Sequence, residues 1–205
     1  MHTIRYAVGA IWMAGVLALA GCDGGGGGGL GSDVGDNNPN VVAAVGDSIT
    51  AGSYPSQLAG MIHKTVINHG HGGATAGDGA ASIGGVLSGD KPGYVLILYG
   101  ANDAITGVNP DDTAAALGDI IGACKANKSI PVIATLTPMF SEHLIYASAA
   151  KRVSERIRTL ASQTGTALCD LENEFGNNAA LLQSDGLHPT TEGDMVIADS
   201  FAAKF

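Results

Sequence analysis

Ser48 is the side chain in this sequence that is best placed to act as a nucleophile. It follows a run of apolar residues, 41–45, that does not alternate with polar ones, which is typical of a strand buried on both faces of a parallel sheet. The run stops at Gly46, so Ser48 falls in the turn at the edge of the sheet, where backbone N–H groups lie nearby. Gly-Asp-Ser is also common in ordinary turns, so the assignment depends on what the rest of the chain supplies.

His188 and Asp185 are the candidate base and its orienting carboxylate. A serine hydroxyl is neutral and needs a base to take its proton. Asp185 precedes His188 by three residues. This spacing lets the carboxylate fold back onto Nδ1 and leaves Nε2 free to face Ser48. The same stretch, DGLHP, could instead be a turn that caps the last helix.

Acyl transfer also needs N–H donors for the negative charge that develops on the carbonyl oxygen. We expect three of them: the backbone N–H of Ser48, a glycine N–H from the glycine-rich loop 68–79, and the side-chain amide of Asn102. Glycine has no Cβ, so its backbone can approach a ligand closely. Asn102 and Asp103 follow a predicted strand, however, and such a pair is also common turn material.

Strands that alternate with helices position these residues. Strands are predicted at 41–45, 65–68, 94–99, 131–136 and 167–171, and helices at 54–64, 78–87, 111–127, 147–163 and 191–203. This alternation predicts an α/β fold, a three-layer α/β/α sandwich around a five-stranded parallel sheet in the flavodoxin-like order 2-1-3-4-5. In that order ligands bind at the carboxyl ends of the first and third strands, so the segments that carry Ser48, Asn102 and His188 should meet at one edge.

Four segments together resemble the sequence blocks of the GDSL, or SGNH, hydrolases. They are GDSIT at 46–50, the loop at 68–73, GAND at 100–103 and DGLHP at 185–189, and they occur in the order of the family. The resemblance extends from residue 41 to the end of the chain. It implies a three-layer α/β/α fold and hydrolysis of carboxylic esters through an acyl-enzyme without a cofactor.

The resemblance also implies which residues act. The matching positions are Ser48, Asp185 and His188 for the catalytic triad, and Ser48, Gly73 and Asn102 for the oxyanion hole. The second block reads HGHGGAT, whereas family members often have S-x-S-G-D-T. Gly72 therefore remains a second possible register for the glycine donor.

Two other interpretations stay open beside the esterase. His69 and His71 could bind a metal ion, but residues two apart at the end of a strand point in opposite directions. No carboxylate or cysteine accompanies them at ligand spacing, so we expect no metal. A non-catalytic binding lipoprotein could keep the same fold, but such a relative would normally have lost Ser48 or His188, and both are present.

Residues 1–21 predict a secretory signal peptide. A positively charged start precedes an apolar run, 6–20, that is too short and wrongly flanked for a resident membrane helix. The ending Leu-Ala-Gly-Cys resembles a bacterial lipobox, which implies cleavage before Cys22 and attachment of lipid to that residue. A short N-terminal anchor helix is the alternative.

Residues 22–40 then predict a lipidated cysteine and a tether. Six consecutive glycines, 24–29, and a following stretch rich in Gly, Asp and Asn cannot bury a core. The hydrolase domain would be 41–205. We expect an exported lipoprotein held on a membrane of the bacterial cell envelope through Cys22, on the periplasmic side or at the cell surface, because several acyl chains on one residue anchor stably.

The predicted domain carries nine Lys and Arg residues against sixteen Asp and Glu residues, a net charge of −7. It has no basic run. Phosphate contacts need clustered Lys and Arg, so we expect no nucleic-acid partner. Charge alone also could not hold the domain on anionic lipid.

Two cysteines remain in the predicted domain, Cys124 and Cys169. An exported protein lies in an oxidising compartment, where the two could pair. Two buried free thiols are equally consistent with the sequence, because spacing along the chain does not give the distance between Cα atoms.

The substrate is predicted to be a carboxylic ester with a short acyl chain. The loops around the expected site, 68–79 and 100–110, consist largely of Gly, Ala, Asn and Asp and offer little apolar wall for a long chain. The exception is 139–145, where Met139, Phe140, Leu144 and Ile145 could form an apolar groove. Short-chain esters, lysophospholipids or thioesters, and acetylated glycans all remain candidate substrates.

Overall fold

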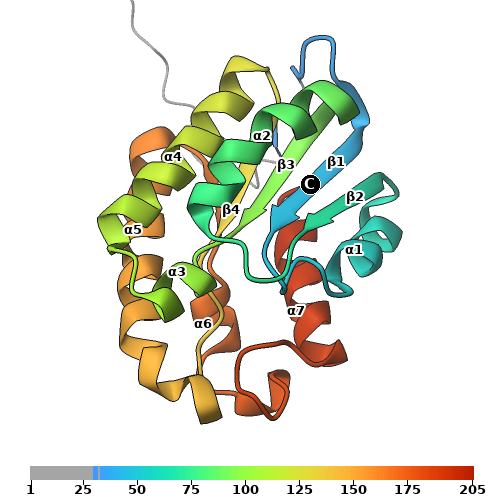
Figure 1. Ribbon diagram of the computed structural model, residues 1–205. Coiled ribbons are helices and arrows are strands. Elements are labelled where there is room, and N and C mark those ends of the chain that lie inside the picture. The colour runs from blue at the N-terminus through green and yellow to red at the C-terminus, as the bar shows by residue number, and fades with distance from the viewer. Residues whose placement is uncertain (1–29, 32) are drawn as a thin grey trace, which may run out of the picture.

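Five parallel strands run through the centre of the computed structural model, which describes residues 30, 31 and 33–205 (Figure 1). The strands lie in the order β2-β1-β3-β4-β5, which confirms the predicted topology. Their bounds are β1 Asn38–Gly46, β2 Thr65–Gly70, β3 Pro92–Leu98, β4 Ile130–Ala134 and β5 Ala167–Cys169. The predicted signal peptide, Cys22 and the run of glycines lie outside the described residues.

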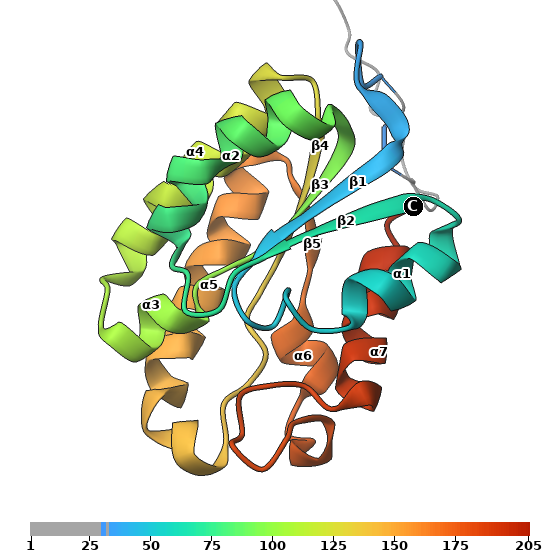
Figure 2. The same ribbon diagram turned by 45° about the vertical axis from the view of Figure 1, so that its right-hand side comes forward.

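Helices cover both faces of the sheet, as predicted, with α2, α4 and α5 on one side and α1, α6 and α7 on the other (Figure 2). The helices are α1 Tyr54–Ile62, α2 Ala76–Asp90, α3 Ala101–Thr106, α4 Pro110–Ala126, α5 Ala147–Thr164, α6 Leu171–Phe175 and α7 Thr191–Ala202, with 3-10 turns η1 Ser141–Tyr146 and η2 Ala179–Leu181. Within the part of the chain that the structure describes, no helix combines the length and apolarity needed to cross a bilayer.

The two central strands are buried on both faces, which is why their sequences do not alternate. All seven residues of β3 and the last five of β1 are buried. The register pairs Gly46 with Leu98 at the carboxyl ends. A Cβ on Gly46 would lie 1.9 Å from Thr50 Oγ1 and 2.5 Å from Leu98 O, so only glycine fits there. The turns that carry Ser48 and Asn102 therefore start side by side.

The strand β1 begins at Asn38, three residues before the predicted start of the domain. The end of the expected tether packs onto the domain as well. Val34 is 5% exposed, Leu30 N–H donates to Lys204 O at 3.0 Å, and Asn37 Nδ2 donates to Asn127 O at 2.7 Å. Two apolar side chains, Leu30 and Val34, and a few amide hydrogen bonds hold this polar stretch on the domain, although its composition alone indicated a free tether.

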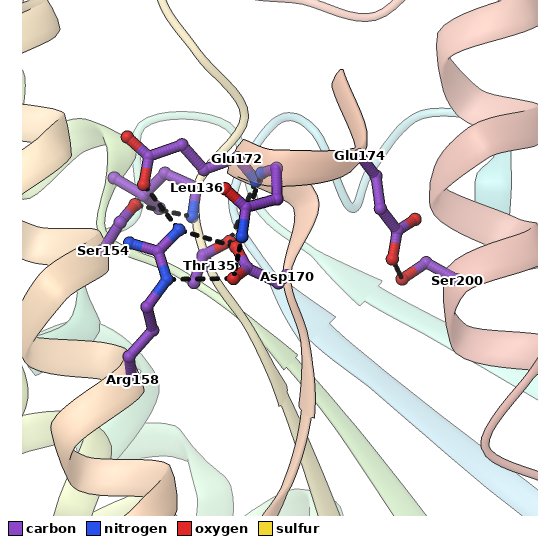
Figure 3. A network of polar contacts seen from close by, with 9 residues as sticks. Thr135, Leu136, Ser154, Arg158, Asp170, Glu172, Glu174 and Ser200 are labelled. Atoms are coloured by element: carbon purple, nitrogen blue, oxygen red, sulfur yellow. Dashed lines mark hydrogen bonds and ion pairs between the residues drawn. The ribbon is translucent and has the colours of Figure 1, made fainter. Parts of the chain in front are cut away.

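The strand β5 is shorter than predicted because Asp170 caps α6 directly after it. Asp170 is also the centre of a polar network between α5 and the start of α6 (Figure 3). Arg158 donates from Nε and Nη2 to the two Asp170 carboxylate oxygens at 2.9 and 2.6 Å, and its Nη2 lies 2.7 Å from Glu172 Oε2. Hydrogen bonds from Arg158 are the main reason that the pKa of Asp170 lies below its usual range.

Cys124 and Cys169 are both buried and free, so the alternative of two unpaired thiols is confirmed. Cys169 Sγ donates to Ser200 O at 3.3 Å. Burial raises the pKa of each thiol to about 12. A thiol with so high a pKa is almost entirely protonated at neutral pH and is a poor nucleophile.

Candidate active site

Ser48, His188 and Asp185 form a continuous hydrogen-bonded chain at the carboxyl edge of the sheet. Ser48 Oγ lies 2.9 Å from His188 Nε2, and His188 Nδ1 lies 2.6 Å from Asp185 Oδ2. Ser48 and His188 come from turns that are 140 residues apart in the sequence. All are partly exposed, with 37% of the His188 side chain open to solvent. The arrangement can pass a proton from the serine hydroxyl to an imidazole that the carboxylate orients.

The turn 185–188 holds the carboxylate rigidly against the imidazole. Asp185 Oδ1 accepts hydrogen bonds from the backbone N–H of Leu187 at 2.9 Å and of His188 at 3.1 Å, while Oδ2 faces the ring. Burial acts to raise the pKa of Asp185, but the hydrogen bonds from the His188 side chain and from these two N–H groups outweigh it and lower the pKa. The carboxylate is therefore ionised at neutral pH.

Phe140 and the adjoining 3-10 turn η1 also hold the turn at residues 185–188 in place. His143 Nδ1 lies 2.8 Å from Asp185 O, and Phe140 N–H donates to Gly186 O at 2.9 Å. Gly186 has a φ of +73°, and a Cβ there would lie 2.1 Å from Phe140 O. Glycine is required for both reasons. The contact between η1 and the turn was not predicted, since nothing in the spacing links residues 140–143 to 185.

Asp47 shapes the turn of the nucleophile. Its Oδ1 accepts the backbone N–H of Ile49 at 2.9 Å, and Ala51 N–H donates to Asp47 O at 3.0 Å. The carboxylate is 1% exposed. Burial raises the pKa of Asp47 to about 6, and the nearby carboxylate of Asp103 acts in the same direction. The residue beside the nucleophile is thus a weak acid at the base of the site.

Asn102 and the glycine-rich loop meet beside this turn. Asn102 Nδ2 donates to Ala74 O at 2.9 Å, which leaves its second amide hydrogen for another acceptor. Ala74 N–H donates to His71 O at 3.1 Å and closes a turn over Gly72 and Gly73, in which Gly73 has a φ of +80°. This conformation at the third position of a turn favours glycine. The side-chain amide of Asn102 therefore holds α3 against this turn of the glycine-rich loop.

The same loop approaches the nucleophile turn through Gly70, for which the sequence predicted no separate role. A Cβ on Gly70 would lie 2.1 Å from Ala51 N. The two turns can therefore touch only because residue 70 is glycine. The clue available in the sequence was the glycine at the point where β2 ends.

His69 and His71 do not converge. His69 Nε2 lies 2.5 Å from Asp90 Oδ2, and His71 Nδ1 lies 3.1 Å from His69 O. Asp90 is a carboxylate partner that the spacing did not reveal, because it lies 21 residues further along the chain. Among residues 30, 31 and 33–205, no three His, Cys, Asp or Glu side chains gather as metal ligands.

A cavity of about 110 Å³ borders the serine–histidine pair. Its lining residues are Ser48, Ile49, Gly52, Gln183, His188, Pro189 and Asp194. A separate hollow of about 480 Å³ is lined in part by Met139, Phe140 and Leu144, and includes neither Ser48 nor His188. The apolar segment considered for an acyl groove therefore lines a different hollow from the one beside the nucleophile.

Known proteins are similar to this chain in sequence or in fold. The chain is 26% identical over 177 residues to the thioesterase 1/protease 1/lysophospholipase L1 of Escherichia coli K12, which covers 80% of this chain and 82% of the relative. The fold is similar to that of the lipase/acylhydrolase of Enterococcus faecalis, with a TM-score of 0.71, 22% identity and coverage of 80% and 93% of the two chains. It is also similar to that of an acetylxylan esterase of Geobacillus stearothermophilus, with a TM-score of 0.71, 20% identity and coverage of 82% and 96%.

The sequence model of the GDSL-like lipase/acylhydrolase family matches residues 44–196. The matched region contains the nucleophile turn, the glycine-rich loop, Asn102 and the turn with Asp185 and His188. It covers the greater part of the chain. The protein therefore belongs to the GDSL-like lipase/acylhydrolase family and is a carboxylic ester hydrolase.

Proposed function

We propose that this hydrolase is a serine esterase in which Ser48 is the nucleophile, His188 the general base and acid, and Asp185 the residue that orients the imidazole. The observation that carries the proposal is the chain of contacts from Ser48 Oγ to His188 at 2.9 Å and on to Asp185 at 2.6 Å. Ser48 Oγ attacks the ester carbonyl while His188 takes its proton. His188 then protonates the departing alcohol, and water hydrolyses the acyl-enzyme by the reverse proton transfers.

The proposed oxyanion hole consists of the Ser48 N–H, the Gly73 N–H and the Asn102 amide. Asn102 supports this role because one of its amide hydrogens is used to hold the loop at Ala74 and the other is left for the substrate. Gly73 supports it through its left-handed backbone at a turn that Asn102 contacts. Gly72, at the neighbouring position of the same turn, is the alternative donor.

The proposed substrates carry short acyl chains such as acetate or butyrate. The cavity beside Ser48 measures about 110 Å³, which is the volume of about four water molecules in the liquid. A longer chain would gain free energy only where an apolar wall buries it. Met139 is already buried in the core, and Leu144 and Ile145 are 60% and 78% exposed. The segment 139–145 therefore supports no enclosed acyl groove at the nucleophile.

Labelling and an ester series test this proposal together. An organophosphonate fluoride should form an adduct on the peptide that contains Ser48, and Ser48→Ala should abolish both labelling and turnover. With p-nitrophenyl esters below micelle-forming concentrations, kcat/KM should be highest at acetate to butyrate and fall towards longer chains. Labelling of another residue would overturn the nucleophile, and a steady rise to the longest soluble chain would overturn the acyl specificity.

A thioesterase or lysophospholipase activity is the second candidate. The name of the Escherichia coli relative includes both activities, and the exposed Leu144 and Ile145 could contact a lipid chain in the open. Carbohydrate O-acetylesterase activity is the third, since one structural neighbour is an acetylxylan esterase. Rates of hydrolysis measured at equal enzyme concentration separate these three activities. The substrates to compare are p-nitrophenyl acetate, palmitoyl-CoA, a lysophospholipid and acetylated xylan.

We further propose that lipid on Cys22 holds the enzyme on a membrane of the cell envelope. The support is the sequence ending Leu-Ala-Gly-Cys after an apolar run. In cell fractionation, the Cys22→Ser variant should move from the membrane pellet to the soluble fraction. Continued pelleting of the processed variant would contradict lipid as the anchor.

A further inference from the structure

Asp194 joins the two chain segments that carry the nucleophile and the base. It lies in the first turn of α7, six residues after His188, and its partner Ser53 lies five residues after Ser48. Asp194 Oδ2 accepts the backbone N–H of Ser53 at 3.2 Å and also the hydroxyl of Ser53. Ser53 is the residue that precedes α1, so the contact ties the start of α1 to the start of α7.

The Ser53–Asp194 contact is a second link between the segments that Ser48 and His188 connect. The Ser48–His188 bond and the Ser53–Asp194 bonds connect the same two segments at two points. Both Ser48 and Asp194 line the cavity of about 110 Å³. Gln57 Nε2 donates to Ser53 Oγ at 3.2 Å and holds that hydroxyl from the side of α1. Hydrogen bonds therefore join the two segments at a second point besides the contact between Ser48 and His188.

Stability alone does not account for a carboxylate at this position. Asp194 is only 7% exposed, and its Oδ1 is buried without a hydrogen-bond partner among the described residues. A buried polar oxygen that is left without a hydrogen-bond partner destabilises the folded state. No Lys or Arg in the part of the chain that the structure describes forms an ion pair with it. What the carboxylate does provide is an acceptor that takes both donors of Ser53.

We propose that Asp194 is a positioning residue that sets the distance between Ser48 Oγ and His188 Nε2 by holding Ser53. The inference rests on the proposed roles of Ser48 and His188. A shift of about 1 Å in a catalytic group can cost about 100-fold in rate. Loss of the contact should therefore lower kcat and leave the binding of a small ester nearly unchanged.

The experiment is a set of four variants assayed with p-nitrophenyl acetate. Asp194→Ala should lower kcat by about 10- to 100-fold with little change in KM. Asp194→Asn should restore most of kcat, because its amide oxygen can still accept both donors of Ser53. Ser53→Ala keeps the backbone bond and should have a smaller effect. The double variant should be no slower than Asp194→Ala, because the two residues act through one contact.

Phe201→Leu is the matched control for a purely structural effect. The rings of Tyr54 and Phe201 stack at 5.6 Å and also join α1 to α7, but Phe201 takes no part in the hydrogen bonds between Ser53 and Asp194. This variant should lower Tm and leave kcat unchanged. If Asp194→Ala lowers only Tm, or if Asn fails to restore kcat, Asp194 is not a positioning residue. If Ser48→Ala retains turnover, the proposed function itself fails instead.

Discussion

Carboxylates gather at two places along the carboxyl edge of the sheet, and the two groups have different hydrogen-bond and ion-pair partners. Beyond β4 and β5, Asp170 and Glu172 share the guanidinium of Arg158 (Figure 3). At the end of β1, Asp47 is bonded to a backbone N–H and Asp194 to Ser53. None of the carboxylates around the catalytic pair has a Lys or Arg partner among the described residues.

The difference separates a structural cluster from a reactive one. At β4–β5 the positive charge of Arg158 is shared by two carboxylates and ties α5 to α6. Around His188 the negative charge of Asp185 remains available to the imidazolium that would form in the proposed mechanism when Ser48 loses its proton. A guanidinium bound to Asp185 would compete for that carboxylate. Among the described residues, the imidazole of His188 therefore shares the Asp185 carboxylate only with backbone N–H groups and not with a guanidinium.

The largest expected effect comes from changing the carboxylate that faces His188. Asp185→Asn should lower kcat by about 10⁴-fold, because an amide N–H opposite Nδ1 favours the tautomer that turns a proton towards Ser48. Steady-state kinetics with p-nitrophenyl acetate measure the loss. The matched change at the other cluster, Asp170→Asn, should leave kcat unaltered. Equal losses in the two variants would remove the distinction between the clusters.

The next largest effect is expected at Asn102, the proposed oxyanion donor that follows β3. Asn102→Ala should lower kcat by about 10²–10³-fold if the free amide hydrogen stabilises the oxyanion. Its bond to Ala74 O is lost as well, so Tm should be recorded in the same preparation. A fall in Tm with kcat unchanged would show that Asn102 only supports the turn.

Asp47 allows the effect of burying a carboxyl group without a Lys or Arg partner to be measured as a pH dependence of stability. Because burial raises the pKa of Asp47 to about 6, the folded protein keeps a proton that the unfolded chain releases from about pH 4 upwards. This contribution to the free energy of unfolding is complete below about pH 4 and is lost as the pH rises through about 6, by up to about 3 kcal/mol. Asp47→Asn keeps an acceptor for Ile49 N–H and should flatten that dependence in urea titrations from pH 4 to 7. An unaltered slope would mean that Asp47 ionises normally.

The smallest effect is expected at the cluster of Arg158 with Asp170 and Glu172. Arg158→Met leaves Asp170 and Glu172 without their cation and should lower the free energy of unfolding by about 1–2 kcal/mol, since all three side chains are partly exposed. Turnover of p-nitrophenyl acetate should not change. Chemical denaturation and kcat should be measured on the same sample. If kcat falls together with the free energy of unfolding, the Arg158 cluster also supports the catalytic residues, and the distinction between the two clusters is wrong.

The sequence by itself determined the sheet order and the members of the proposed triad. The runs at β1 and β3 are buried on both faces, and such burial leaves a local pattern of apolar residues. Asp185 and His188 are three residues apart, so their contact is also a local matter. Where the determinants lie within one turn or one element, the chain can be interpreted without its fold.

Tertiary structure alone decided the contacts that join distant segments. The bonds from Asp194 to Ser53 span 141 residues, and the pairing of His69 with Asp90 spans 21, so no spacing rule reveals either. The same holds for the burial that raises the pKa of Asp47 and for the packing of Val34 onto the domain. These properties depend on which surfaces are brought together and how much water they exclude, and both are set only when the whole chain has folded.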